Sequence, residues 1–155
     1  MKTFTDISGR IWTITVTVDT IKRVRSLTDT NLLDLTNGKL MQELADDTCK
    51  LVDVLFAVCK PEADSKNITD EDFGRSLAGD ATDNAQTALF EELVDFFPSR
   101  KRHILRDMLA KVKLVEDAAE KKAMTLLNDP RMMEKMQESL EAAYQTALQS
   151  LETKP

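Results

Sequence analysis

The sequence has few of the side chains that most catalytic and metal sites require. Its 155 residues include one histidine, His103, and two cysteines, Cys49 and Cys59. Four basic residues surround His103, and no second histidine is present to complete a metal site. We therefore expect no catalytic residue, no metal site and no bound cofactor.

Motifs for nucleotide binding and nucleophilic catalysis are also missing. Neither Gly74 nor Gly79 is followed by the Gly-Lys-Ser/Thr ending of a phosphate-binding loop. Glu91, Glu92 and Asp95 lie within about one helical turn, but the Glu-x-x-His pair of carboxylate-bridged metal sites is absent. A solvated acidic face is the better interpretation of these carboxylates, and the chain is predicted not to be an enzyme.

Long apolar runs are absent as well. A membrane span needs about 20 apolar residues, and no stretch approaches that length. Residues 1–6 resemble a strand rather than the apolar segment of a signal peptide. On one helix the two cysteines would lie about 15 Å apart, too far for a disulfide. These features predict reduced cysteines, no membrane partner and a cytoplasmic location.

The charges are unevenly distributed along the chain. The net charge is −6, but residues 62–97 carry ten acidic and two basic side chains, whereas residues 98–127 carry eight basic and four acidic ones. No aromatic residue lies between Arg100 and Lys122. Nucleic-acid-binding surfaces usually combine a larger basic surplus with aromatic side chains. We expect no nucleic-acid partner, and we expect the two segments to neutralise each other within the fold.

Residues 2–18 have the pattern of a β-hairpin. Trp12, Ile14, Val16 and Val18 alternate with threonines, which predicts a strand with one buried face. The segment 6–10 has turn chemistry and includes a glycine. A two-stranded sheet alone is only marginally stable, so the Trp12 face must lie on helices or on another copy.

The rest of the sequence has the periodicity of helices. The first is expected to follow Asp19 as its N-cap. A second helical pattern runs from Leu40 to a stop at Pro61, with a possible new start at Asp46-Asp47, and a polar loop covers 61–68. Two further helices are expected, one from Thr69 to Gly79 and one from Asp80 or Thr82 to Phe97-Pro98.

A long helix is predicted from Ser99, as its N-cap, to about Asn128, and thirty residues make a rod of about 45 Å. Asp129-Pro130 marks a joint to a last helix, and the two helices are expected to pack as an antiparallel hairpin. The predicted fold is mainly α: a small helical domain with an N-terminal β-hairpin over residues 1–98, and a long C-terminal helical hairpin over residues 99–155.

Two groups of candidate protein-interaction residues flank Pro98. The first group would line an apolar groove, with ordinary core packing as the favoured alternative; it comprises Leu89, Leu93, Phe96 and Phe97. The second group is the basic cluster Arg100, Lys101 and Arg102 in the first turn of the long helix, where each cation opposes the helix dipole by about 0.3–1 kcal/mol. Pairing with Glu91, Glu92 and Asp95 across the Pro98 bend is the favoured interpretation of this cluster, and an acidic partner or a second copy is the alternative.

A third group of candidates lies near the start of the last helix. Met132, Met133 and Met136 cluster there, and methionine adapts to irregular apolar partners. Packing inside the helical hairpin is the favoured interpretation, and binding of a partner is the alternative.

One segment carries a family resemblance. The run from Gly79 to Pro98, GDATDNAQTALFEELVDFFP, resembles the tail assembly chaperones of long-tailed, siphovirus-type bacteriophages. Three further stretches support it: residues 4–12, the helix at 51–56, and residues 68–73. The resemblance covers roughly residues 1–105.

The resemblance implies a small helical protein made in the infected host and absent from the mature virion. Such chaperones bind the apolar tape measure protein, keep it soluble and help recruit tail tube subunits, without catalytic residues. Self-association is expected too, because an apolar stripe on a long helix and the open edges of a hairpin leave surfaces that one compact copy does not cover. The alternatives are a helical adaptor or regulator with one defined protein partner, and an enzyme with an unrecognised site.

Overall fold

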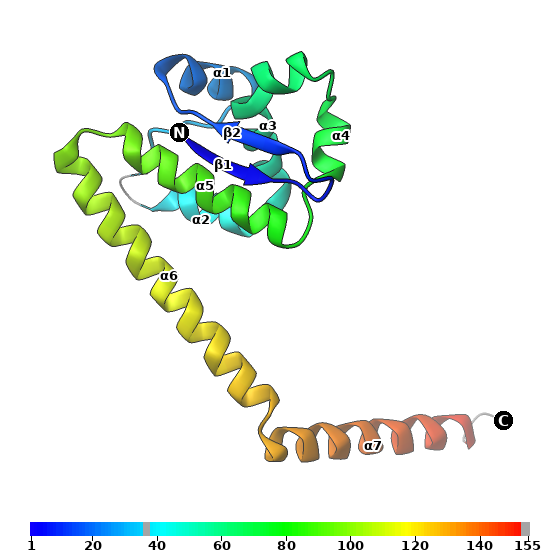
Figure 1. Ribbon diagram of the computed structural model, residues 1–155. Helices are drawn as coiled ribbons and strands as arrows, with labels where there is room; N and C mark the ends of the chain where they lie inside the picture. The colour runs from blue at the N-terminus through cyan, green and yellow to red at the C-terminus, as the bar shows by residue number, and fades with distance from the viewer. Residues whose placement is uncertain (36–37, 153–155) are drawn as a thin grey trace. The chain divides into compact units, whose positions relative to one another are not determined.

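The computed structural model describes residues 1–35 and 38–152 and confirms a mainly α fold with an N-terminal β-hairpin (Figure 1). The chain forms two units, residues 1–107 and the residues from Met108 onward. The elements of the described ranges follow in chain order: β1 (Lys2–Thr5), β2 (Ile11–Ile14), α1 (Val18–Thr28), α2 (Lys39–Asp46), α3 (Thr48–Ser65), α4 (Asp70–Arg75), α5 (Asp80–Phe96), α6 (Ser99–Leu127) and α7 (Pro130–Glu152).

The hairpin has the predicted turn but shorter strands. The Asp6 N–H donates to the Arg10 carbonyl at 3.0 Å, and the Gly9 N–H donates to the Asp6 carbonyl at 2.9 Å. Gly9 has φ 80°, which fits a three-residue loop that ends on a left-handed residue. The strand expected to reach Val18 ends at Ile14, because the Thr17 hydroxyl accepts from the Thr20 N–H and starts α1. Thr17, not Asp19, is therefore the N-cap.

The carboxylate of Asp6 organises this hairpin. Its Oδ1 accepts from the N–H groups of Ser8 and Arg10 at 2.9 Å each. Its Oδ2 accepts from Arg10 Nε at 2.7 Å and from Trp12 Nε1 at 2.9 Å. Burial alone would raise the pKa of Asp6, but the hydrogen bonds from Trp12 and Arg10 outweigh burial and hold the pKa below its ordinary value.

Replacing Asp6 with asparagine is expected to lower the free energy of unfolding by about 2 kcal/mol at pH 7, because the charged acceptor is lost. Because the pKa of Asp6 is lower in the native state than in the unfolded state, its carboxylate stabilises the fold at pH values above the unfolded-state pKa. This stabilisation is lost as the pH falls through the native-state pKa. The difference between wild type and Asp6→Asn should therefore shrink on acidification, as measured by urea unfolding. Asp19→Asn, at a carboxylate that is 85% exposed, is the control. Equal losses for the two variants would contradict this role.

The core of the first unit lies between the hairpin and its helices. Trp12 is fully buried, and its ring meets that of Phe73 on α4 edge-on at 4.8 Å. The helix α3 contacts α1, α2, α4 and β2, while α5 lies along β1 (Figure 1). The prediction that the Trp12 face rests on helices is confirmed.

Pro61 does not stop the third helix, contrary to the sequence prediction. The helix α3 continues through it to Ser65, so the loop expected over 61–68 is mostly helical. Pro61 has no N–H to donate to the Ala57 carbonyl. Arg23 Nε of α1 donates to that carbonyl instead, at 2.8 Å. A long-range contact thus satisfies the acceptor that the proline leaves open.

Other helix boundaries follow the sequence more closely. Asp47 caps α3, which confirms the new start at Asp46-Asp47, and Thr69 caps α4, as predicted. However, α4 ends at Arg75 rather than at Gly79, and α5 begins at Asp80. At the start of α6 the Pro98 carbonyl accepts the first helical N–H groups, so Ser99 is the first helical residue and not the cap.

The two predicted C-terminal helices form, but their predicted packing does not. The Asp129 carboxylate accepts from the Arg131 N–H at 3.0 Å, which confirms the joint at Asp129-Pro130. From Ala110 to Gln149 every side chain except half-buried Asp129 is exposed, so the antiparallel contact is absent from the described residues. Between Val115 and Met124 the apolar side chains of α6 are alanines only, and these small side chains leave little surface for the two helices to bury together.

Candidate protein-interaction surfaces

Among the described residues, no three side chains of His, Cys, Asp or Glu are placed to hold a metal ion. No described helix is long and apolar enough to span a bilayer. Cys49 is exposed and Cys59 is buried, both as free thiols. Burial raises the pKa of Cys59 to about 12, so this thiol stays protonated and unreactive at neutral pH.

The predicted apolar groove on α5 is part of the core. Leu89 and Leu93 have no exposed surface and Phe97 is 9% exposed, while Phe96 is half-buried against the Phe97 ring. The helix α5 uses this face to pack on the hairpin and on α3. The groove interpretation is therefore wrong, and the core alternative is confirmed.

The basic cluster at the start of α6 caps the preceding helix. Arg102 donates to the Phe97 carbonyl through Nε at 3.2 Å and through Nη2 at 3.1 Å. Lys101 Nζ lies 5.8 Å from the centre of the Phe97 ring. Arg100 is exposed and forms no ion pair with the described residues. Within this cluster, Arg102 thus satisfies a main-chain acceptor at the end of α5. The spacing of charges in the sequence could not indicate this contact.

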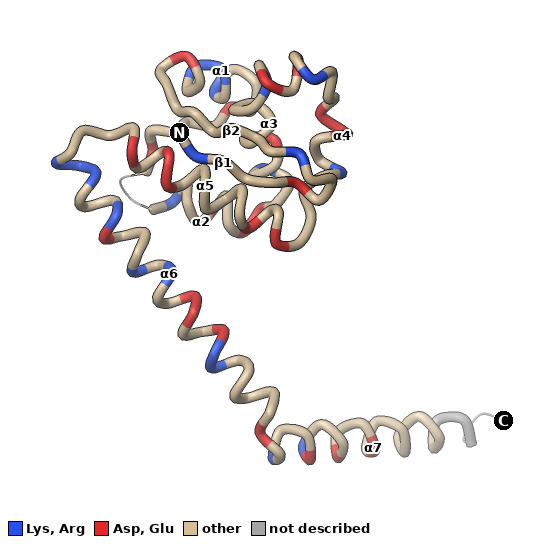
Figure 2. Tube along the Cα trace, in the orientation of Figure 1, with Lys and Arg blue, Asp and Glu red and all other residues tan. Residues whose placement is uncertain are grey.

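The acidic residues expected to pair with this cluster have other partners. Glu91 pairs with Lys2 at 2.8 Å, and Glu92 pairs with the amino group of Met1. Asp95 pairs with Arg106, one turn beyond the cluster. Burial alone would raise the pKa of Asp95, but Arg106 outweighs burial and lowers it. One ion pair, between Asp95 and Arg106, thus joins α5 to α6, and it does not involve the predicted basic partners. Figure 2 shows acidic positions along α5 and basic positions at the start of α6.

The methionines of α7 are exposed. Met133 and Met136 show 62% and 55% of their surface, and Met132 shows 39%. Together with Leu140, Tyr144 and Leu148 they make up what we call the apolar face of α7, with most members spaced four residues apart. A shallow hollow of about 410 Å³ lies on this helix between Met132 and Ala143. The interpretation as hairpin core is wrong, and the methionines remain accessible for a partner.

The distal half of α6 exposes further large apolar side chains: Val112, Leu114, Val115, Met124, Leu126 and Leu127. The helical periodicity predicts Val112, Val115 and Leu126 as part of the core of a helical hairpin. It gives no role to Leu114, Met124 and Leu127. Soluble monomers rarely expose apolar patches beyond a few hundred Å², and larger patches mark interaction sites. The second unit therefore carries the strongest structural indication of function.

Comparisons with family models, curated sequences and solved structures gave no match. The exposed apolar side chains of the second unit are therefore the structural feature that bears most on function. An apolar helix face of this kind pairs with an amphipathic helix or lies in a partner's groove.

Proposed function

We propose that the chain is a non-enzymatic tail assembly chaperone of the long-tailed phage type. It binds apolar helical segments of the tape measure protein, keeps that protein soluble and helps recruit tail tube subunits. The observation that carries the proposal is the exposed apolar face of α7. The proposal places the chain in the cytoplasm of the infected host and outside the mature virion.

The energetics favour many weak contacts rather than one tight contact. A partner that covers about 500 Å² of apolar surface contributes about 12 kcal/mol at 25 cal/mol per Å². Association itself costs about 4–15 kcal/mol, so the net affinity of one copy is low. Several copies on one long partner gain affinity because each bound copy raises the effective concentration of the next. In the free chain the same face would mediate self-association, which binding of the partner displaces.

The first unit would keep the coated partner dispersed. Its segment 62–97 has ten acidic and two basic side chains, and many of the acidic ones, including Glu71, Asp72, Asp80 and Asp83, are exposed. Like charge of this size opposes aggregation of neighbouring complexes. The buried Leu89 and Leu93 belong to the body that presents this charge, not to the binding surface.

Co-expression with the tape measure protein encoded in the same genome tests the proposal. We expect the tape measure protein to be soluble and to co-purify with the chain, and to be insoluble when expressed alone. Equal solubility with and without the chain, together with no complex on purification, would refute the proposal.

A further inference from the structure

The outer edge of β2 is closed by side chains of α3. The Thr13 N–H donates to Glu62 Oε2 at 2.9 Å, and its carbonyl accepts from Cys59 Sγ at 3.8 Å. The Ile11 carbonyl accepts from Lys66 Nζ at 3.0 Å. The main-chain groups of Thr13 and Ile11 therefore point away from β1 and toward α3.

The register of the hairpin then determines which main-chain N–H and C=O groups of β1 point away from β2. Thr3 lies opposite Thr13, and Thr5 lies opposite Ile11. In an antiparallel pair, the main-chain groups of two opposite residues either hydrogen-bond to each other or point away from each other, toward the outer edges of the two strands. The N–H and C=O groups of Thr3 and Thr5 therefore point to the outer edge of β1. In the described part of the chain none of these four groups has a hydrogen-bond partner.

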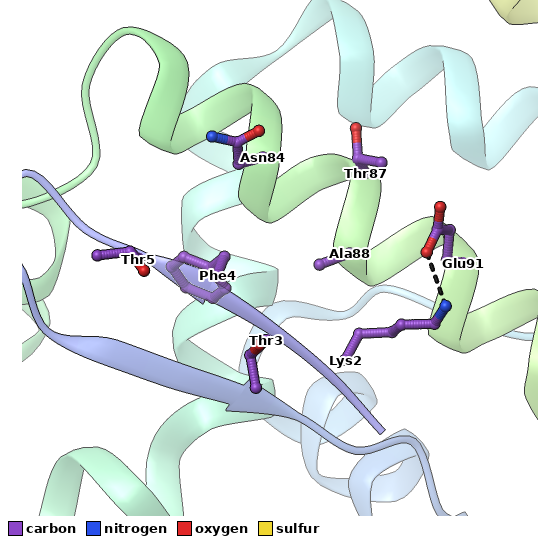
Figure 3. A pocket seen from close by; sticks show the side chains of 8 residues that line it. All are labelled: Lys2, Thr3, Phe4, Thr5, Asn84, Thr87, Ala88 and Glu91. Atoms are coloured by element: carbon purple, nitrogen blue, oxygen red, sulfur yellow. Dashed lines mark ion pairs between the residues drawn. The ribbon is translucent and has the colours of Figure 1, made fainter.

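A groove of about 340 Å³ lies beside this edge, between β1 and α5 (Figure 3). Its α5 side presents the exposed residues Asn84, Thr87 and Glu91. They span about 10.5 Å of helix, which matches the length of three strand residues. Lys2 crosses one end to pair with Glu91 at 2.8 Å, so the groove has polar walls and little net charge.

We propose that an extended segment of a partner polypeptide binds in this groove as a third strand, with main-chain hydrogen bonds to Thr3 and Thr5. Strand addition of this kind takes its affinity from the main chain and its specificity from the adjoining side chains. The neutral threonine and asparagine lining fits a segment with small or β-branched uncharged side chains. The site is separate from the apolar face of α7 and does not depend on the proposed function.

A second copy of β1 is a poorer occupant of the groove. It would bring its own α5 toward this one and place a second Glu91 near the first. Each copy carries a net charge of −8 over residues 62–97, and this charge would repel the other copy. The unpaired edge therefore favours an uncharged partner segment.

The test uses the full ¹⁵N-labelled chain and the peptide acetyl-Ser-Thr-Val-Thr-Val-Thr-Ser-amide as the probe. We expect the amide signals of Thr3 and Thr5 to shift, and their hydrogen exchange to slow at least tenfold at saturation. The same peptide with alternate residues N-methylated should leave both signals unchanged. Absence of these shifts, or shifts at Ile11 and Thr13 instead, would overturn the proposal. Shifts that depend on protein concentration without peptide would overturn it in favour of a second copy.

Two proline variants distinguish binding at the edge of β1 from binding at the edge of β2. Thr5→Pro removes an outward N–H and no bond of the hairpin, and should weaken binding of the probe at least tenfold. Ile11→Pro makes the matched change on the opposite edge and should leave binding unchanged. Thr87→Trp, at an exposed position, fills the groove without altering the strand and should also abolish binding. Full binding by a folded Thr87→Trp protein would contradict the proposal.

Discussion

Replacing Leu89 with alanine is expected to lower the free energy of unfolding by about 3 kcal/mol, within the usual range for a buried leucine. Leu89 is fully buried on the face of α5 that packs against β1 and α3. The substitution removes apolar contacts and leaves a cavity that a well-packed core fills only in part. Urea unfolding monitored by circular dichroism measures the change.

The matched control is Leu140→Ala on α7, where the leucine is 69% exposed. This change should stay within about 0.5 kcal/mol, because no buried contact is lost. A small effect at Leu89, or a large one at Leu140 in dilute solution, would show that the core and the exposed face have been assigned the wrong way round.

Replacing Met133, Met136, Leu140 and Tyr144 together with glutamine is expected to weaken partner capture about a hundredfold or more. Each buried apolar side chain contributes up to about 1.5–3 kcal/mol, and a factor of ten in affinity corresponds to about 1.4 kcal/mol. Glutamine is a good helix former, so α7 itself should persist. Co-purification with the tape measure protein measures capture, and light scattering measures self-association, which should decrease in parallel.

The control for this variant is the double substitution Glu134→Gln and Glu138→Gln, at exposed acidic positions outside the apolar face of α7. It changes the charge of the helix but leaves its apolar side chains in place, so capture should be nearly unchanged. Equal loss in both variants would mean that charge, not apolar contact, holds the partner.

Local chemistry made several features of the fold predictable from sequence. The turn at residues 6–10, the cap at Asp47 and the joint at Asp129-Pro130 each depend on side chains close to the feature itself. The alternation around Trp12 likewise identified the buried face of the hairpin. Short-range hydrogen bonding and periodicity suffice for such elements.

Features that depend on distant contacts, or on a choice between nearby partners, were not predictable in the same way. The helix α3 passes through Pro61 because Arg23 of α1 takes up the open carbonyl of Ala57. Arg102 bonds to the carbonyl of Phe97, whereas charge pattern alone suggested an acidic side chain. The same periodicity also describes buried and exposed apolar stripes, so it could not separate Leu89 in the core from Met136 on the surface.

The apolar face of α7 is expected to be free in the isolated chain and covered in the complex. Hydrogen exchange of the backbone amides, followed by mass spectrometry at low protein concentration, tests it most directly. We predict rapid exchange along α7 in the free chain, slow exchange in α5, and strong protection of α7 once the tape measure protein is bound. Protection of α7 in the free chain as strong as that of α5, independent of concentration and unchanged by the partner, would mean that this face is not the binding surface.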